Sequence, residues 1–267
     1  MNLEEIYKME NEEERISAIY DIFDEASRLD SKAANIEFIT TVKYIEQYLK
    51  PGMKILDLGA GTGCYSLYFA KKGYEVTAVE LVKKHAAAIK QSKTEEMNLT
   101  IIQGNAVVNL KTMEDGTFDL ILCLGPLYHL AKQKDREECV TEIKRVCTND
   151  GRMFFAFVNN DMVITTQTMY YDSNYLETGR YNRQTFKVND FPFVFDTLSS
   201  ARELINGCGL TIEKEIASDG MNELLQDKVN ALSDAAYRQW LKYHFYICEK
   251  PEFLGASNHL LFVCRQD

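Results

Sequence analysis

The chain has 267 residues, of which 46% are hydrophobic and 26% charged, and its formal net charge at pH 7 is −10. These values predict one domain over residues 1–267, and no apolar run nears the roughly 18–20 residues that cross a bilayer, which argues against a membrane protein. The net negative charge and the lack of a block of lysine or arginine disfavour nucleic acid as a partner. The acidic N-terminal residues do not have the pattern of a signal peptide, so a cytoplasmic location is expected.

Residues 16–48 repeat apolar side chains at helical spacing, as at Ile16 and Ile19. The Pro51-Gly52 pair ends this region. The sequence therefore predicts an N-terminal helical cap over residues 1–50.

Residues 51–158 alternate short apolar runs with helical patterns. Strands are predicted over residues 53–58, 74–80, 99–104, 118–125 and 152–158, and helices over residues 65–72, 83–92 and 135–146. Asp135 is predicted to cap the last of these helices, and the Asn-Asp-Gly sequence at 149–151 is predicted to form a turn. Repeated strand–helix units favour a parallel sheet with helices on both faces.

Residues 159–196 lack a clear period and are rich in tyrosine, which is typical of a functional segment or of a poorly ordered one. This composition suits a substrate lid, in which Arg180 and Arg183 could clamp an anionic substrate. The alternative is a solvated loop held by its tyrosines.

Residues 197–267 return to regular patterns and are predicted to complete the sheet. A helix is expected over residues 197–209, a strand over 210–217, a helical stretch over 224–246 and a last strand over 259–265.

Three glycines, Gly59, Gly61 and Gly63, follow the first predicted strand. Their spacing is neither that of the dinucleotide fingerprint nor that of a P-loop. Asp57 would repel a pyrophosphate but suits a cationic ligand, and Glu80, at the end of the second strand, can accept both ribose hydroxyls of an adenosine. An adenosine with positive charge and no phosphate indicates S-adenosylmethionine; the alternative is a structural turn.

The segments "ILDLGAGTG", "VTAVEL", "IIQGNAVVNL" and "FDLILCLGPLYHL" resemble motifs of the class I S-adenosylmethionine-dependent methyltransferases. The "GPLYHL" loop is similar to that of a bacterial branch of small-molecule type. The resemblance implies a Rossmann-like α/β fold with a seven-stranded, mostly parallel sheet, its last strand antiparallel, and a lid insertion after the fifth strand. Where this family usually has Asp, the chain has Asn105, whose amide oxygen can still bond the adenine amino group.

The residue patterns and the resemblance together assign the following residues to the cofactor: Asp57, Gly59, Ala60, Gly61, Glu80, Leu81, Asn105, Ala106, Leu124, Tyr20 and Arg28. No metal is expected, because the cysteines form no CxxC pair.

The methyl group should lie near Tyr128 and His129, because ligands of open α/β sheets bind outside the carboxyl ends of the strands. His129 is the candidate general base, since its ordinary pKa is about 6.5, and Tyr128 is a candidate wall against the sulfonium. Packing roles are the alternative for both.

The expected reaction is methyl transfer from S-adenosylmethionine to an O, N or S nucleophile of a small molecule, giving S-adenosylhomocysteine, by a monomer or homodimer. The alternatives are an RNA or protein methyltransferase, a nicotinamide-dependent oxidoreductase and a non-catalytic S-adenosylmethionine-binding protein.

Overall fold

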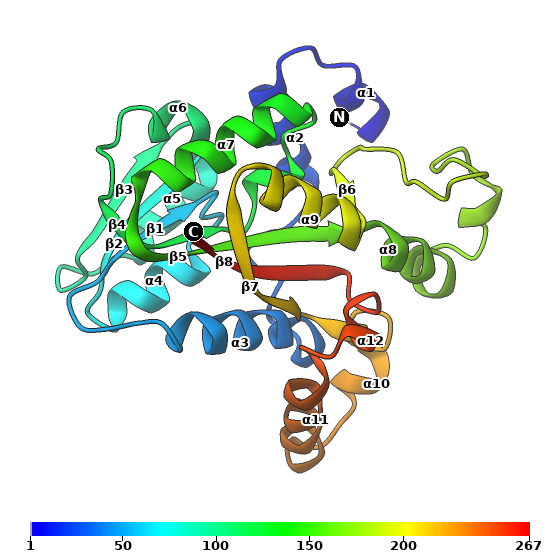
Figure 1. The fold of residues 1–267 in the computed structure, drawn as a ribbon. Coiled ribbons are helices and arrows are strands. Elements are labelled where there is room, and N and C mark those ends of the chain that lie inside the picture. The colour runs from blue at the N-terminus through cyan, green and yellow to red at the C-terminus, as the bar shows by residue number, and fades with distance from the viewer. Residues whose placement is uncertain (1) are drawn as a thin grey trace.

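The computed structural model describes residues 2–267. Its first five strands are parallel and alternate with helices (Figure 1). The strands are β1 (Lys54–Leu58), β2 (Glu75–Glu80), β3 (Leu99–Gln103), β4 (Phe118–Cys123) and β5 (Cys147–Asn159). The helices between them are α4 (Cys64–Lys71), α5 (Lys83–Ser92), α6 (Ala106–Leu110) and α7 (Gln133–Val146).

The sheet runs in the order β3-β2-β1-β4-β5-β8-β7, and β8 (His259–Gln266) is antiparallel to both of its neighbours, β5 and β7 (Leu210–Ala217). The predicted antiparallel last strand is therefore confirmed. The prediction of seven strands is wrong, because a two-residue strand, β6 (Phe195–Asp196), pairs with the end of β5 and makes eight. A buried ion pair between Arg136 on α7 and Asp196 holds β6 in place. The sequence did not predict this strand because two residues are too few to show a periodic pattern.

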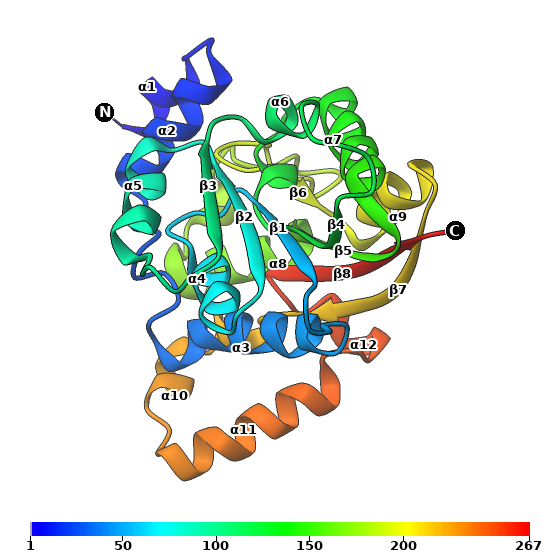
Figure 2. The same cartoon turned by 90° about the vertical axis from the view of Figure 1, so that its left-hand side faces the viewer.

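Helices cover both faces of the sheet, as predicted. Figures 1 and 2 show α7 and α9 (Leu198–Gly207) on one face, with α3 (Lys32–Glu46) and α4 on the other. Each face has its own apolar core: Ile143 and Leu204 belong to the first, and Ile45 and Phe69 to the second. Burial on both sides explains why β1 and β4 are nearly continuous apolar runs.

The N-terminal region consists of α1 (Leu3–Tyr7), α2 (Glu12–Ile22) and α3. The helical pattern read over residues 16–48 is interrupted, because Phe23 is extended and Ser31 caps α3 by accepting from the Ala34 N–H (3.2 Å). The interruption lets α2 lie at the carboxyl ends of the strands while α3 packs under the sheet (Figure 1).

The segment after β5 is more regular than its composition suggests. It contains α8 (Asn160–Thr166), a π-helical turn (Gln167–Tyr171) and a 3-10 turn (Tyr175–Glu177). The Asn-Asp-Gly sequence at 149–151 is not a turn but lies within β5, opposite a register shift in β4, and the N-cap of α7 is Lys132 rather than Asp135.

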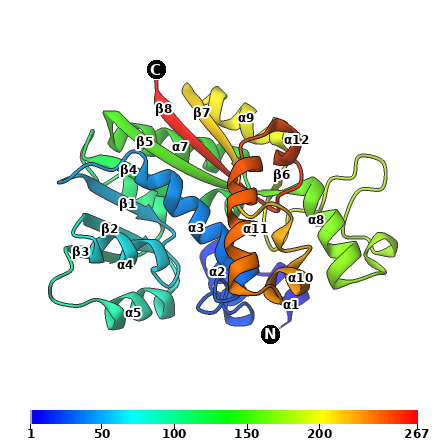
Figure 3. The same ribbon diagram turned by 90° about the horizontal axis from the view of Figure 1, so that it is seen from below.

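The predicted helical stretch over residues 224–246 is divided into α10 (Gln226–Asn230) and α11 (Asp234–Ile247), with Ser233 capping the second. The short α12 (Pro251–Leu254) then leads into β8. Figure 3 shows α11 running beside α3. Among residues 2–267, no helix has both the length and the apolar character needed to cross a bilayer.

Candidate active site

The glycine loop connects β1 to α4 and is bound to the neighbouring strand. The backbone N–H groups of Gly59 and Ala60 donate to the Val79 carbonyl (2.8 and 3.1 Å). Gly59, Gly61 and Gly63 all have left-handed φ angles (68°, 55° and 91°), and a Cβ at Gly59 would lie 3.0 Å from the Pro126 side chain. Glycine is required here because the backbone turns sharply against its neighbours.

Glu80, the last residue of β2, is buried against this loop. One carboxylate oxygen accepts from the Gly61 N–H and the other from the Val82 N–H, both at 2.7 Å. These bonds fix the carboxylate, and each oxygen keeps lone-pair capacity for a further donor. The loop and the acidic end of β2 therefore form one rigid unit.

Asp57, in β1, is almost fully buried and accepts a hydrogen bond from the Ser66 hydroxyl (2.5 Å). Burial raises the pKa of its carboxyl to about 6, although the Ser66 bond opposes the shift. The group is thus ionised at pH 7 without a cationic partner, which favours a positively charged ligand.

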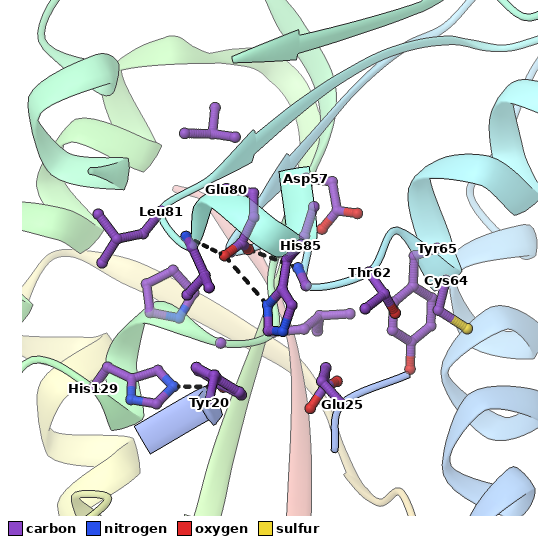
Figure 4. Close-up of a pocket in the computed structure, with 18 of the residues that line it drawn as sticks. Tyr20, Glu25, Asp57, Thr62, Cys64, Tyr65, Glu80, Leu81, His85 and His129 are labelled. Atoms are coloured by element: carbon purple, nitrogen blue, oxygen red, sulfur yellow. Dashed lines mark hydrogen bonds and ion pairs between the residues drawn. The ribbon is translucent and has the colours of Figure 1, made fainter. Parts of the chain in front are cut away.

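A cavity of about 240 Å³ opens in front of these groups. It lies between the ends of β2, β3 and β4, α2 and the segment that leads into α3, as the close-up in Figure 4 shows in part. Every residue that the sequence assigned to the site lines it: Tyr20, Arg28, Asp57, Gly59, Ala60, Gly61, Glu80, Leu81, Asn105, Ala106, Leu124, Tyr128 and His129. Their individual roles stay predictions.

His129 and Tyr20 meet across the cavity mouth. The Tyr20 hydroxyl and His129 Nε2 are 2.8 Å apart (Figure 4), and burial lowers the pKa of His129 to about 4. The imidazole is therefore neutral at pH 7, and its Nε2 is engaged by the Tyr20 hydroxyl. The Tyr128 hydroxyl is also engaged, since it donates to the Leu124 carbonyl (2.8 Å).

Arg28 forms part of the cavity wall together with two carboxylates. It bonds Glu37 (Nη1–Oε2, 2.7 Å) and Glu25 (Nε–Oε1, 3.1 Å). His259 Nδ1 stands 3.6 Å from Glu37 and bonds Asp219 (2.9 Å). Within residues 2–267, the one guanidinium of the wall is thus held by acidic groups from neighbouring elements.

Asn105 caps α6 with its side chain. Its amide oxygen accepts from the N–H groups of Val107 (2.9 Å) and Val108 (3.2 Å), and its Nδ2 donates to Glu13 on α2 (2.9 Å). An adenine amino group would have to share this oxygen, so the adenine contact stays a prediction.

None of residues 159–196 lines the cavity, Arg180 and Arg183 included. Tyr170 and Tyr171 donate to carboxylates of the later chain, Asp227 and Glu223. The segment reaches the site through its end, where Phe193 packs edge-on to His129 (5.3 Å between ring centroids) and the Val194 N–H donates to the Tyr128 carbonyl (2.8 Å). A lid role stays a prediction.

Sequence reasoning missed several lining residues, among them His85, Glu25 and Glu37. His85 follows Glu80 by five residues on the first turn of α5, and that spacing is the one signal that could have found it. Glu25 and Glu37 reach the cavity only because the chain breaks between α2 and α3, which no local pattern indicated.

One group of three potential metal ligands occurs among the described residues: Asp219, Glu223 and His259. The bond between His259 Nδ1 and Asp219 makes it an ion pair rather than an open ligand set. The expectation of no metal stays a prediction.

Residues 56–155 match the family model described as "Methyltransferase domain". This segment is a methyltransferase domain. It contains the glycine loop, Glu80 and the end of β4, so the elements that build most of the cavity wall belong to it.

The chain is also similar to curated methyltransferases over somewhat less than half of its length. The chain is 29% identical to YqeM of Bacillus subtilis (strain 168), named as a candidate methyltransferase, over 49% of this chain and 52% of that protein. It is 27% identical to a ubiquinone biosynthesis O-methyltransferase of Idiomarina loihiensis over 42% of this chain and 44% of that enzyme. The chain spans about half the length of these relatives.

Two further comparisons show over how much of the chain the similarity extends. A 23S rRNA (uracil(747)-C(5))-methyltransferase of Pyrococcus abyssi is 39% identical, but over only 24% of this chain and 16% of that enzyme. The crystal structure of the PH0226 protein from Pyrococcus horikoshii OT3 superposes with a TM-score of 0.62 at 17% identity, covering 94% of this chain and 99% of that one. The methyltransferase domain and the elements around it thus share a Rossmann-like fold with that protein.

Proposed function

We propose that the protein transfers the methyl group of S-adenosylmethionine to an O, N or S nucleophile of a small molecule, producing S-adenosylhomocysteine. One observation carries the proposal: two buried carboxylates, Asp57 and Glu80, flank a glycine loop at the carboxyl ends of adjacent parallel strands. Among the described residues, Arg28 is the only lysine or arginine in the same wall, and it is already paired. This arrangement disfavours a dinucleotide phosphate and favours a cationic adenosine.

In this arrangement Glu80 would accept from the ribose hydroxyls, and Asn105 and Ala106 would border the adenine. Asp57 would lie toward the positive charge of the methionine portion, with Leu124 near the sulfonium. Tyr20 and Arg28 would close the cavity from the N-terminal side. All these side chains line the same cavity, which supports assigning them to one ligand.

Methyl transfer is an in-line displacement. A bond forms from the acceptor to the methyl carbon while the carbon–sulfur bond breaks, and sulfur keeps the electron pair as a neutral thioether. The leaving group is already activated, so the protein mainly orients donor and acceptor, which can supply several kcal/mol. If the acceptor must lose a proton, neutral His129 would receive it through the Tyr20 hydroxyl, because that hydroxyl occupies Nε2.

A small molecule is favoured as the acceptor over a macromolecule. The cavity lies under α2, and the chain carries a net charge of −10, which opposes binding of a phosphate backbone. The similarity to an O-methyltransferase extends over a longer segment than the similarity to the rRNA enzyme. A cytoplasmic location and a monomeric or homodimeric state belong to the same proposal.

Calorimetric titration with S-adenosylmethionine and S-adenosylhomocysteine tests the proposal. Glu80→Ala should weaken binding by about 10–100-fold, the effect of losing hydrogen bonds to a charged group. Glu75→Ala is the matched control, because Glu75 begins the same strand and its half-exposed side chain faces solvent near Lys54. Absence of binding to the unmodified protein, or equal affinities for both variants, would contradict the assignment.

A second measurement distinguishes a protein that only binds S-adenosylmethionine from one that transfers its methyl group. Release of S-adenosylhomocysteine from S-adenosylmethionine is followed with panels of hydroxyl, amine and thiol acceptors, and with total RNA. Transfer to a small acceptor supports the proposal, whereas transfer to RNA alone would overturn the small-molecule assignment.

A further inference from the structure

His85 is a buried histidine whose Nδ1 has no hydrogen-bond partner among residues 2–267. Its side chain is 6% exposed and lines the cavity. Its Nδ1 is one of three buried side-chain nitrogens without a partner in the described chain. The other two belong to side chains that are bonded through another nitrogen: His129 to Tyr20, and Arg136 to Asp196.

The orphaned nitrogen lies beside the carboxylate that the proposed function assigns to the ribose. His85 Nδ1 and Glu80 Oε1 are 3.7 Å apart, and Figure 4 shows the imidazole extending toward Glu80 within the cavity. This distance is too long for a direct hydrogen bond, yet a single oxygen can lie at about 2.8 Å from both atoms. The gap therefore has the size that one hydroxyl would bridge.

The chemistry of the two groups favours a hydroxyl in this gap. The Glu80 carboxylate can only accept, whereas His85 in its Nδ1–H tautomer donates. A hydroxyl both donates and accepts, so it satisfies the two groups at once. The Tyr20 ring, edge-on to His85 at 5.0 Å between centroids, holds the imidazole in place.

We propose that His85 binds one ribose hydroxyl of the cofactor jointly with Glu80, as a specificity-determining residue of the adenosine site. This inference rests on the proposed function. The residues assigned from the sequence did not include His85, which enters the proposal through its position on the first turn of α5 and in the cavity wall.

The test is a double-mutant cycle between the side chain and the ligand hydroxyls. Binding of S-adenosylhomocysteine and of its 2′-deoxy and 3′-deoxy forms is measured by calorimetry for the unmodified protein and for His85→Leu. The substitution should weaken binding of the parent ligand by about 3–10-fold, and should lower the cost of removing one hydroxyl, but not the other, by a similar factor.

Two further variants complete the design. His85→Gln keeps a donor near the same place and should recover part of the affinity, which also serves if His85→Leu folds poorly. His244→Leu removes another buried histidine, bonded to Thr40 outside the cavity wall, and should leave the hydroxyl dependence unchanged.

The outcomes separate the two proposals. If His85→Leu weakens all three ligands equally, or none of them, the His85 assignment is overturned while a Glu80→Ala effect still supports the cofactor site. If S-adenosylhomocysteine does not bind the unmodified protein, the proposed function itself fails.

Discussion

Asp57 shows how one residue can serve a ligand at the expense of stability. Its carboxyl is buried, and its pKa is raised from about 3.8 to about 6. The folded protein therefore holds a proton on this group at pH values where the unfolded chain has released it. The contribution of Asp57 to the free energy of unfolding is therefore most favourable below pH 4. It falls by about 3 kcal/mol as the pH rises to 6.

Asp57→Asn should remove this loss, because the amide carries no charge and its oxygen can still accept from Ser66. We expect the variant to be about 1–3 kcal/mol more stable than the unmodified protein at pH 7.5, and equally stable at pH 4. It should also bind S-adenosylmethionine more weakly, since the negative charge is gone. Urea unfolding at both pH values measures the stability, and equal stability at pH 7.5 would contradict the argument.

Helix α2 closes one side of the cavity through few contacts. Ile19 is its one buried residue, and the Tyr20 ring packs on His85. Polar bonds add to the attachment, among them Tyr20 to His129, Lys84 to Asp21 and Asn105 to Glu13. An element held in this way opens at low free energy compared with the sheet. We therefore expect α2 to control how fast the cofactor leaves.

Tyr20→Phe should speed the dissociation of S-adenosylhomocysteine by about 3–10-fold, because it removes one hydrogen bond and keeps the ring against His85. Stopped-flow displacement measures the rate. Tyr7→Phe on α1 is the control, since the Tyr7 ring packs on Phe191 and Tyr7 is 64% exposed. Equal dissociation rates for the two variants would show that α2 does not restrain the ligand.

Elements with strong local periodicity are the ones that the sequence predicts best. The expected helix over residues 83–92 and strand over residues 210–217 coincide with α5 and β7. The break before α3 and the course of residues 149–151 through β5 depend on packing between distant segments, so the same patterns predict them wrongly. The glycine loop and Glu80 could be predicted because they are adjacent in sequence to strand ends, whereas Glu37 and His259 meet only in the fold.

At the scale of the whole molecule, a chain of charges connects the two ends of the sequence behind the cavity wall. Arg28 precedes α3, Glu37 lies on it, and His259 begins β8, with Asp219 following β7. The N-terminal cap is thus tied to the antiparallel edge of the sheet, and the cavity wall depends on both.

This connection should make stability depend on pH through His259. Burial alone would lower its pKa, but Glu37 and Asp219 outweigh burial and raise it to about 9. Glu223 and Arg28 also face this group, with opposite effects on its charge. Protonated His259 therefore adds up to about 3 kcal/mol to the free energy of unfolding. This contribution is fully present below about pH 6.5 and is lost as the pH rises through 9.

Comparison with His259→Asn isolates this contribution. Between pH 6 and pH 9.5 the free energy of unfolding of the unmodified protein should fall by up to about 3 kcal/mol more than that of the variant, because asparagine does not titrate. Urea unfolding across this range measures both slopes. His244→Asn is the control: burial lowers the pKa of His244 to about 4, so its loss changes the pH dependence only below about pH 7.5 and in the opposite direction, and leaves the fall between pH 7.5 and pH 9.5 unchanged. Parallel curves for the unmodified protein and His259→Asn would mean that His259 is not held as a cation, and that its charge does not contribute to the tie between the N-terminal cap and the sheet.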